Sequence, residues 1–304
     1  MTFSIIIPTK DRTDDLKNCV RSIIKQTVLP QELIIVDASS DSIGAVNQEN
    51  CKKIIEDKVK LIYIKSTPGS NRQRNTGADH ACGEIIFFID DDIVLKEDYF
   101  EKILEVYEIK KALNTGGVQG TTILNYFNQT WISRTFRKLF FMTRASISEK
   151  SRFLPSLGYV YISMPKEIIE VEAMSSGLCS YYKNIFNEFR FDEKFEACQD
   201  LEISYRVSRK YKLFQTPYAL LTHNHSTSTH LSSLQHNKRH IINTYRLAKK
   251  YLPKRNKNWL AYYWSVLGEI ILSAAKSCVK FSFDPLIGTL SGIKYILMNE
   301  GKGS

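Results

Sequence analysis

Apolar and polar positions along the first 120 residues switch repeatedly between two periods. Short apolar runs alternate with segments in which apolar residues recur every three or four positions, as on one face of a helix. The expected strands are 3–8, 32–37, 59–64, 85–89 and 118–122, and the expected helices are 14–26, 44–57, the later part of 69–82, and 96–111. This alternation predicts an α/β fold with a mostly parallel, doubly wound, Rossmann-like sheet.

The regular alternation stops after residue 122. Residues 125–165 are aromatic and basic and show no clear sheet period. Further on, we expect strand character over 171–182, a helix over 199–210, extended chain over 212–217 and 219–223, and helices over 231–251 and 258–281. These elements divide the chain into an α/β domain over 1–228, with halves 1–122 and 123–228, and a helical, basic and aromatic carboxyl-terminal region over 229–304.

An abrupt change of polarity follows the apolar run 85–89, which ends in Asp90, Asp91 and Asp92. The run suits a buried strand, so its carboxylates lie at the carboxyl end, where ligands bind in open α/β sheets. Because adjacent carboxylates repel one another, something positive must hold them. A hard divalent cation that bridges to a diphosphate is a natural partner. The pattern indicates an enzyme that handles an activated nucleotide.

The composition is that of an ordinary globular protein, because 43% of the 304 residues are hydrophobic and 24% are charged. The six cysteines are scattered without a Cys-x-x-Cys pair, which argues against a zinc knuckle and fits reduced thiols. The chain begins directly with strand character and lacks the features of a signal peptide. We therefore expect a cytoplasmic protein.

The net charge of +10 is unevenly distributed. Basic residues concentrate in 129–152 and in 231–258, and such regions attract phosphates, anionic lipid or nucleic acid. The apolar segment 259–275 is short for a membrane span and contains Glu269, so we expect a packed helix or one lying in a membrane interface. Segment 131–141 mixes aromatic and basic residues and suits a lipid-phosphate surface, a lid over an acceptor site, or core with a solvated face.

Four motifs occur in a fixed order along the first 92 residues. They are Pro8-Thr9-Lys10-Asp11-Arg12, then Val36-Asp37-Ala38-Ser39-Ser40-Asp41, then Gly69 with Arg72, Arg74, Asn75 and Gly77, and finally Asp90-Asp91-Asp92. In this order and spacing the set resembles the inverting glycosyltransferases of family 2, with the GT-A fold, of the kind that assembles bacterial surface polysaccharides. The resemblance covers about residues 3–225.

The resemblance implies a role for each matching residue. Nucleotide contacts are expected from Pro8, Thr9, Asp11, Asp37, Arg72, Arg74, Asp90 and Asp91. The ligands expected for Mn²⁺ or Mg²⁺ are Asp92, Asp90 and His223, of which Asp92 is the more direct. Simple chemistry agrees, because a strand-end carboxylate accepts hydrogen bonds from a ribose or base, and arginine offers a rigid fork to phosphate. The alternative for His223 is an ordinary histidine with no ligand.

A further match lies in Gln199-Asp200-Leu201-Glu202, which is similar to the acceptor-side segment of the family. Here Gln199 replaces the usual glutamate, and Asp200 matches the aspartate that acts as catalytic base. A helix N-terminus stabilises an ionised carboxylate, whereas partial burial raises its pKa toward a useful range. The alternative role of Asp200 is a helix N-cap.

The function expected from these features is metal-dependent, inverting transfer of a hexosyl or deoxyhexosyl group. The donor would be a nucleoside-diphosphate sugar, with UDP or dTDP favoured, and the acceptor a hydroxyl of a glycan or lipid-linked saccharide. The basic, aromatic carboxyl-terminal region would contact the inner, anionic membrane face as a peripheral protein.

Three other functions compete with this one. A sugar-nucleotide pyrophosphorylase needs a glycine-rich loop with a lysine after its first strand, and residues 8–12 contain no glycine. A basic nucleic-acid-binding protein would show a recognisable module, and the strand-end carboxylates would repel phosphates, so we expect no nucleic-acid partner. A non-catalytic scaffold on the same fold would be excluded by any turnover.

Overall fold

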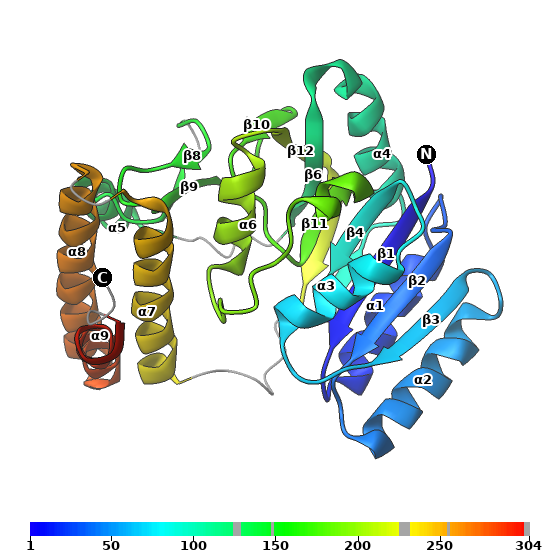
Figure 1. Ribbon diagram of the computed structural model, residues 1–304, viewed down its shortest axis with the longest axis horizontal. Helices are drawn as coiled ribbons and strands as arrows, with labels where there is room; N and C mark the ends of the chain where they lie inside the picture. The colour runs from blue at the N-terminus through cyan, green and yellow to red at the C-terminus, as the bar shows by residue number, and fades with distance from the viewer. Residues whose placement is uncertain (124–128, 147–148, 225–231, 254–255, 301–304) are drawn as a thin grey trace. The chain divides into compact units, whose positions relative to one another are not determined.

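The protein folds into two compact units in a computed structural model (Figure 1), which describes residues 1–123, 129–146, 149–224, 232–253 and 256–300. The first unit consists of 1–126, 163–194 and 199–226. The second unit consists of 127–162, 195–198 and 227–304. Each unit is therefore built from segments that are distant in the sequence.

The first unit is built around a large mixed sheet. Its helices are α1 (Thr13–Ile24), α2 (Asp41–Ile55), α3 (Ser70–His80), α4 (Tyr99–Ile109) and α6 (Gln199–Val207), with short 3₁₀ helices at Lys111–Leu113 and Lys183–Asn187. Its strands are β1 (Phe3–Thr9), β2 (Glu32–Asp37), β3 (Lys60–Lys65), β4 (Ile85–Ile89), β5 (Ile93–Leu95), β6 (Thr115–Thr122), β10 (Ile169–Val171), β11 (Leu178–Tyr182) and β12 (Lys212–His223).

Four of the eight strand pairs that the structure describes in this sheet are parallel, including all three pairs among β1 to β4, and the other four are antiparallel. Among the described residues, the strand order is β10-β12-β6-β11-β4-β1-β2-β3, and β5 pairs with β12. Pairs β4–β1, β1–β2, β2–β3 and β6–β12 are parallel, whereas β11 is inserted antiparallel between β4 and β6. The register places Thr9 beside Asp37 and Ile6 beside Phe88, so β1, β2 and β4 end at one edge of the sheet.

Two apolar cores cover the two faces of the sheet because side chains alternate along each strand. Ile5 and Ile7 of β1 pack with α1, α2 and α4, whereas Ile6 packs on the other face with residues of α3 and α6. Burial of β1, β2 and β4 on both faces explains why their sequences are mostly apolar. Ser4 of β1 is an exception, and its buried hydroxyl donates to Glu32 of β2. The helices of each layer are visible in Figure 1.

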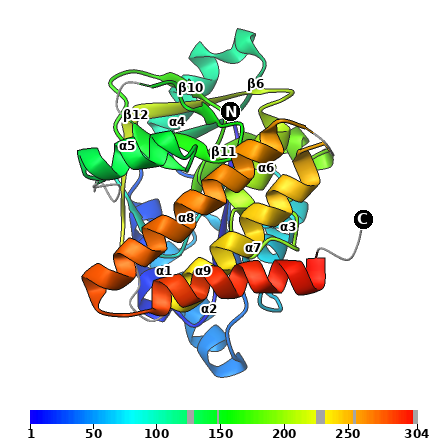
Figure 2. The same cartoon turned by 90° about the vertical axis from the view of Figure 1, so that its left-hand side faces the viewer.

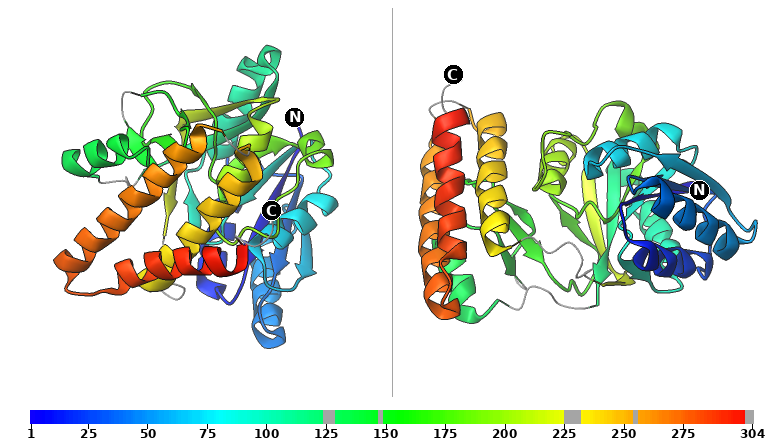
Figure 3. Two further views of the ribbon diagram at one scale, coloured as in Figure 1. Left: turned by 60° about the vertical axis from the view of Figure 1, so that its left-hand side comes forward. Right: turned by 90° about the horizontal axis from the view of Figure 1, so that it is seen from below.

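The second unit is mainly helical. It contains α5 (Trp131–Leu139), a small sheet of β7 (Arg144–Ser146), β9 (Tyr159–Ile162) and β8 (Arg152–Phe153), then α7 (Ser233–Tyr251), α8 (Asn258–Lys280) and α9 (Asp284–Tyr295), with a π-helical turn at Ile296–Glu300. Figure 3 shows α9 crossing α7 after the turn that joins it to α8. Among the described helices, none combines the length and the apolar character that crossing a bilayer requires.

Small residues allow close helix contacts in the second unit. A Cβ on Gly288 or Gly292 of α9 would collide with, or press on, the backbone of α7, near Leu234 and Lys238 respectively. A Cβ on Gly268 of α8 would lie 2.6 Å from Cβ of Phe140, just beyond α5. Phe140 stacks on Trp264 with ring centroids 4.7 Å apart. These glycines therefore permit the contacts that join α5, α7, α8 and α9.

The predicted fold class is confirmed, with three local differences. Segment 171–182 is not one strand but two, β10 and β11, because residues 172–177 leave the sheet. Segments 212–217 and 219–223 form a single strand, β12, with an irregular register. Helix α9 was not predicted as a separate element, although it lies in the region 229–304 that was expected to be helical. Residues 127–162 group with the carboxyl-terminal helices, and the proposed functional division at residue 228 stays a prediction.

Candidate active site

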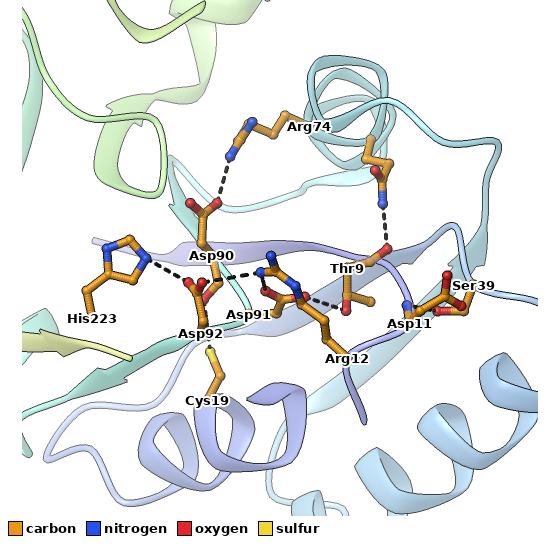
Figure 4. A network of polar contacts seen from close by, with 11 residues as sticks. Thr9, Asp11, Arg12, Cys19, Ser39, Arg74, Asp90, Asp91, Asp92 and His223 are labelled. Atoms are coloured by element: carbon orange, nitrogen blue, oxygen red, sulfur yellow. Dashed lines mark hydrogen bonds and ion pairs between the residues drawn. The ribbon is translucent and has the colours of Figure 1, made fainter. Parts of the chain in front are cut away.

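The carboxylates that follow β4 form a polar network with the ends of neighbouring strands (Figure 4). Asp91 Oδ2 accepts a hydrogen bond from Thr9 Oγ1 at 2.7 Å, and Asp91 Oδ1 accepts one from Arg12 Nη1 at 2.9 Å. The same Arg12 nitrogen lies 3.2 Å from Asp92 Oδ2, and His223 Nε2 lies 2.9 Å from Asp92 Oδ1. Thr9, Arg12 and His223 thus hold two of the three carboxylates.

Burial and these contacts shift the proton affinities of the network. Burial raises the pKa of Asp91 to about 6, and the bonds from Thr9 and Arg12 oppose that rise. Burial acts in the same direction on Asp92, but the bond and charge of His223, helped by Arg12, outweigh it and lower the pKa of Asp92. Burial would lower the pKa of His223, yet its pairing with Asp92 raises it. Asp92 is therefore held as a carboxylate.

Asp90 takes a different position, aimed at helix α3. Its Oδ1 accepts a bond from Arg74 Nη2 at 2.6 Å, and its side chain is 31% exposed, against 5% for Asp91 and 9% for Asp92. Gly177 faces the Asp90 carboxylate, and a Cβ there would collide with it. Asp90 is the carboxylate of the three that is most open to a ligand.

Arg74 is buried with part of its guanidinium unused. The residue is 3% exposed, and its Nε and Nη1 atoms have no hydrogen-bond partner among the residues that the structure describes. Its guanidinium lies 5.7 Å from the ring centroid of Phe191. A buried hydrogen-bond donor without a partner lowers the stability of the fold. Guanidinium nitrogens left unpaired in this way indicate that an anionic ligand binds here.

Asp37, at the end of β2, is fully occupied by neighbouring groups. Its Oδ1 accepts from the Ser39 amide at 2.7 Å, and its Oδ2 accepts from Asn47 Nδ2 at 2.9 Å and from the Tyr63 hydroxyl. The residue is 2% exposed. In this arrangement Asp37 orders the loop after β2, and its predicted contact with a base stays a prediction.

The other predicted nucleotide contacts differ in position. Pro8 lies in β1 beside Val36. Asp11 follows β1 in a left-handed conformation, with φ of 55°, and its amide donates to Ser39 Oγ at 2.7 Å. The structure does not bring Arg72 into the carboxylate network, because its exposed side chain bonds Glu193 and Thr67.

Asp200 is the second residue of helix α6. Its Oδ1 accepts a bond from the Leu201 amide at 2.9 Å. Burial raises the pKa of Asp200, while this backbone bond and the charge of Arg74 oppose the rise. The negative charge of Asp90 adds to the rise. Asp200 therefore belongs to the same electrostatic environment as Asp90 and Arg74, with a proton affinity shifted toward that of a useful base.

The chemistry of the predicted metal ligands fits Mn²⁺ or Mg²⁺. Carboxylate oxygens suit both ions, and an imidazole suits manganese. Across the ranges that the structure describes, no three histidine, cysteine or acidic side chains are gathered into a complete metal cage. Magnesium-type ions commonly bind through one or two carboxylates and substrate phosphates, so a cage of three protein side chains is not required, and the predicted ligation by Asp90, Asp92 and His223 stays a prediction.

Sequence reasoning did not assign a role to Arg12 or Gln73. Arg12 supplies the positive partner that the adjacent carboxylates require, and its position directly after β1 was the available signal. Gln73 Nε2 donates to the carbonyl oxygens of Thr9 and Val36, at 2.8 and 2.7 Å, and so ties α3 to the ends of β1 and β2. Gln73 lies between Arg72 and Arg74, and no pattern marked it.

Comparison with known proteins places this arrangement in a family. The sequence profile of "Glycosyl transferase family 2" matches residues 4–161, about half of the chain. The chain therefore belongs to glycosyltransferase family 2, as the sequence motifs predicted.

Curated relatives match segments of different lengths. "Glycosyltransferase GlyA" of Streptococcus pneumoniae is 27% identical over 62% of this chain and 25% of its own length. The "putative teichuronic acid biosynthesis glycosyltransferase TuaG" of Bacillus subtilis is 31% identical over 34% of this chain and 40% of its own. A "GalNAc(5)-diNAcBac-PP-undecaprenol beta-1,3-glucosyltransferase" of Campylobacter jejuni is 35% identical over 29% of each. The matches thus span a quarter to two fifths of these relatives.

Solved structures support the fold. The crystal structure of GalNAc-T7 with UDP, GalNAc and Mn²⁺ superposes with a TM-score of 0.63 at 15% identity, over 98% of this chain and 57% of that one. The crystal structure of TarS from S. aureus gives 0.50 at 15% identity, over 90% and 42%. These likenesses confirm a GT-A-like fold.

Proposed function

We propose that this protein is a metal-dependent inverting glycosyltransferase that uses a nucleoside-diphosphate sugar. The observation that carries the proposal is the pairing of Arg74, buried with two unused guanidinium nitrogens, with the half-open carboxylate of Asp90. A diphosphate would satisfy the arginine directly. It would also complete the coordination of a divalent cation held by Asp90 and Asp92, with His223 close by.

The main electrostatic requirement of the reaction is to stabilise the negative charge on the leaving diphosphate. Breaking the bond between the anomeric carbon and the diphosphate leaves negative charge on the phosphate oxygens. Arg74 is positioned to stabilise that charge because its guanidinium is already fixed by burial and by Asp90. A bound divalent cation would supply further charge neutralisation at the same place. Arg12 and His223 keep Asp92 ionised for that role.

Asp200 supplies the base in this proposal. The acceptor hydroxyl oxygen attacks the anomeric carbon from the face opposite the leaving diphosphate, and the Asp200 carboxylate takes the hydroxyl proton. A base works best when its pKa approaches the working pH, and burial moves Asp200 in that direction. One displacement at the anomeric carbon inverts its configuration.

The relatives favour particular partners for the two substrates. GalNAc-T7 was crystallised with UDP and Mn²⁺, which favours a uridine donor and a manganese-type ion here. The Campylobacter relative is named for an undecaprenol-linked acceptor, and TuaG for teichuronic acid biosynthesis. We therefore propose a UDP- or dTDP-sugar donor and a glycan or lipid-linked saccharide acceptor, met at a membrane surface on the cytoplasmic side.

The direct test is the product released from the donor. The full chain is incubated with UDP- and dTDP-sugars and Mn²⁺, and phosphorus NMR follows the nucleotide. The proposal expects a nucleoside diphosphate, with slow hydrolysis when no acceptor is present. Release of pyrophosphate, or no turnover with any donor and acceptor extract, would contradict it.

A further inference from the structure

Helix α8 is apolar on the face that it turns to solvent. Leu260, Tyr263, Trp264, Leu267 and Ile271 are 73, 58, 41, 42 and 41% exposed, respectively. Their spacing of three or four residues places them in one stripe along the helix. Away from this stripe, α8 packs inward through the buried residues Tyr262, Ser273 and Ser277. Trp264 stacks on Phe140. A surface helix of a globular protein normally turns its polar side to water, so folding does not explain the exposure of Leu260, Leu267 and Ile271.

The neighbouring helices extend this apolar surface. On α9 and the residue before it, Phe283, Ile287 and Leu290 follow the same spacing and are 74, 47 and 47% exposed, and Leu297, in the π-helical turn after α9, is 70% exposed. On α5, Trp131 and Ile132 are 73 and 72% exposed. The end of α5 is joined to α8 by a hydrogen bond from Trp264 Nε1 to the Leu139 carbonyl at 2.9 Å. Figure 2 shows α5, α8 and α9 in front of α7.

Positive charge surrounds this surface. The second unit has 18 basic and five acidic residues, a net charge of +13 in a chain whose total is +10. Exposed lysines stand on the same helices or at their ends, among them Lys138, Lys257, Lys276 and Lys294. One of the five acids, Glu269, points toward His240 of α7, with 3.6 Å between Oε1 and Nε2. The outward charge of α8 is therefore positive.

We propose that the apolar faces of α5, α8 and α9, here called the docking face, bind an anionic lipid bilayer from one side. Apolar and aromatic side chains enter the interfacial region, and the surrounding lysines meet the lipid phosphates. Tryptophan and tyrosine suit this position because each has an apolar ring and a polar atom. A second copy is a poorer occupant, because self-association through this face would bring two units of charge +13 together.

The inference concerns the second unit alone and goes beyond sugar transfer. Its test uses the full chain and vesicles of phosphatidylcholine, with and without phosphatidylglycerol. All three tryptophans, Trp131, Trp259 and Trp264, lie in the second unit, so intrinsic fluorescence reports on it. Anionic vesicles should shift the emission to the blue, and brominated lipid should quench it. Added salt should weaken the binding.

Paired substitutions locate the contact. The double substitution Leu267→Gln with Ile271→Gln should weaken partitioning to anionic vesicles by about tenfold or more, because two aliphatic side chains no longer enter the bilayer. Ile109→Gln with Leu113→Gln is the matched control, because these residues of the first unit are 65 and 43% exposed. Lys257→Gln with Lys294→Gln should weaken binding by about tenfold, and Lys52→Gln with Lys111→Gln should not.

Four results would overturn the proposal. The first is that the chain does not sediment with anionic vesicles, and the second is that it binds neutral vesicles equally well. The third is that the Leu267→Gln/Ile271→Gln variant binds like the control variant. The fourth is that light scattering shows a dimer, which this variant converts to monomer, while vesicle binding is absent. Circular dichroism and thermal unfolding confirm that each variant is folded. Nucleotide release is measured separately, so failure of docking and failure of sugar transfer are distinguished.

Discussion

The two units depart from an ordinary globular surface in opposite ways. The first unit buries charge: Arg74, Asp91 and Asp92 are each less than 9% exposed at the edge of the sheet. The second unit exposes apolar side chains along α8 and α9 that a core would normally enclose. Both arrangements cost folding free energy, the first through desolvation and the second through hydration of apolar surface.

The contrast separates two kinds of partner. Buried charge with unused hydrogen-bonding capacity calls for a small, charged ligand that fits a fixed geometry. An exposed apolar face bordered by lysines calls for an extended, anionic surface. The predictions below test whether each departure serves binding or is needed for folding.

The largest effect is expected at the carboxylate nearest the proposed metal. Asp92→Asn should lower the rate of sugar transfer by about 10⁴-fold, because several kcal/mol of charge stabilisation would be lost. It should also abolish the metal-dependent part of nucleotide binding, measured by calorimetry. Asp98→Asn, at the start of α4, is the control. Metal-dependent binding unchanged in Asp92→Asn would remove Asp92 from the site.

Removal of the proposed base should affect turnover and spare binding. Asp200→Asn should lower the transfer rate by about 10³-fold while nucleotide affinity stays within about twofold. The base must be ionised, so the wild-type rate should rise with pH through the pKa of Asp200, which burial places above the ordinary range for aspartate. The residual rate of Asp200→Asn should lack this acidic limb. An active Asp200→Asn enzyme would refute the assignment.

The buried charges of the first unit should be essential to its stability. Arg12→Met leaves Asp91 and Asp92 without their shared cation and should lower the unfolding free energy by about 3 kcal/mol at neutral pH. Arg21→Met, on the exposed side of α1, should change it by less than about 0.5 kcal/mol. Chemical denaturation measures both. Equal losses would show that the Arg12 network contributes nothing particular to folding.

The smallest effect is expected on the docking face. Leu267→Ala should change the unfolding free energy by less than about 0.5 kcal/mol, because Leu267 is 42% exposed. The same substitution at Leu247, which is 1% exposed, should cost about 2–5 kcal/mol. A large loss at Leu267 would mean that the stripe supports folding, and the contrast between the units would fail.

The sequence predicted the parts of the fold that local pattern determines. The buried strands β1, β2 and β4 are mostly apolar, and polar residues marked their carboxyl ends: Thr9 and Asp37 are the last residues of β1 and β2, and Asp90 follows β4. Helix α9 was missed because Pro285, Gly288 and Gly292 resemble helix breakers. In the structure Pro285 lies in the first turn of α9, where a backbone N–H has no hydrogen-bond partner within the helix, so its absence costs nothing. Both glycines face α7.

The carboxylates of the candidate site could be predicted from the sequence, whereas the residues that contact them could not. Asp90, Asp91 and Asp92 are adjacent in sequence, so their grouping needs no tertiary information. The contact of Arg12 with Asp91 and Asp92 depends on β1 lying beside β4, and the bond from Tyr63 to Asp37 depends on β3 lying beside β2. Such contacts follow from strand order, which local periodicity does not specify.

The central claim is that the strand-end carboxylates and Arg74 form a metal-assisted nucleotide-diphosphate site. Its most direct test is the thermal stability of the full chain with UDP, dTDP, GDP or CDP, each with and without Mn²⁺. We predict that one of these, UDP or dTDP first, raises the melting temperature only when Mn²⁺ is present. No stabilisation by any nucleotide, with or without the metal, would contradict the claim.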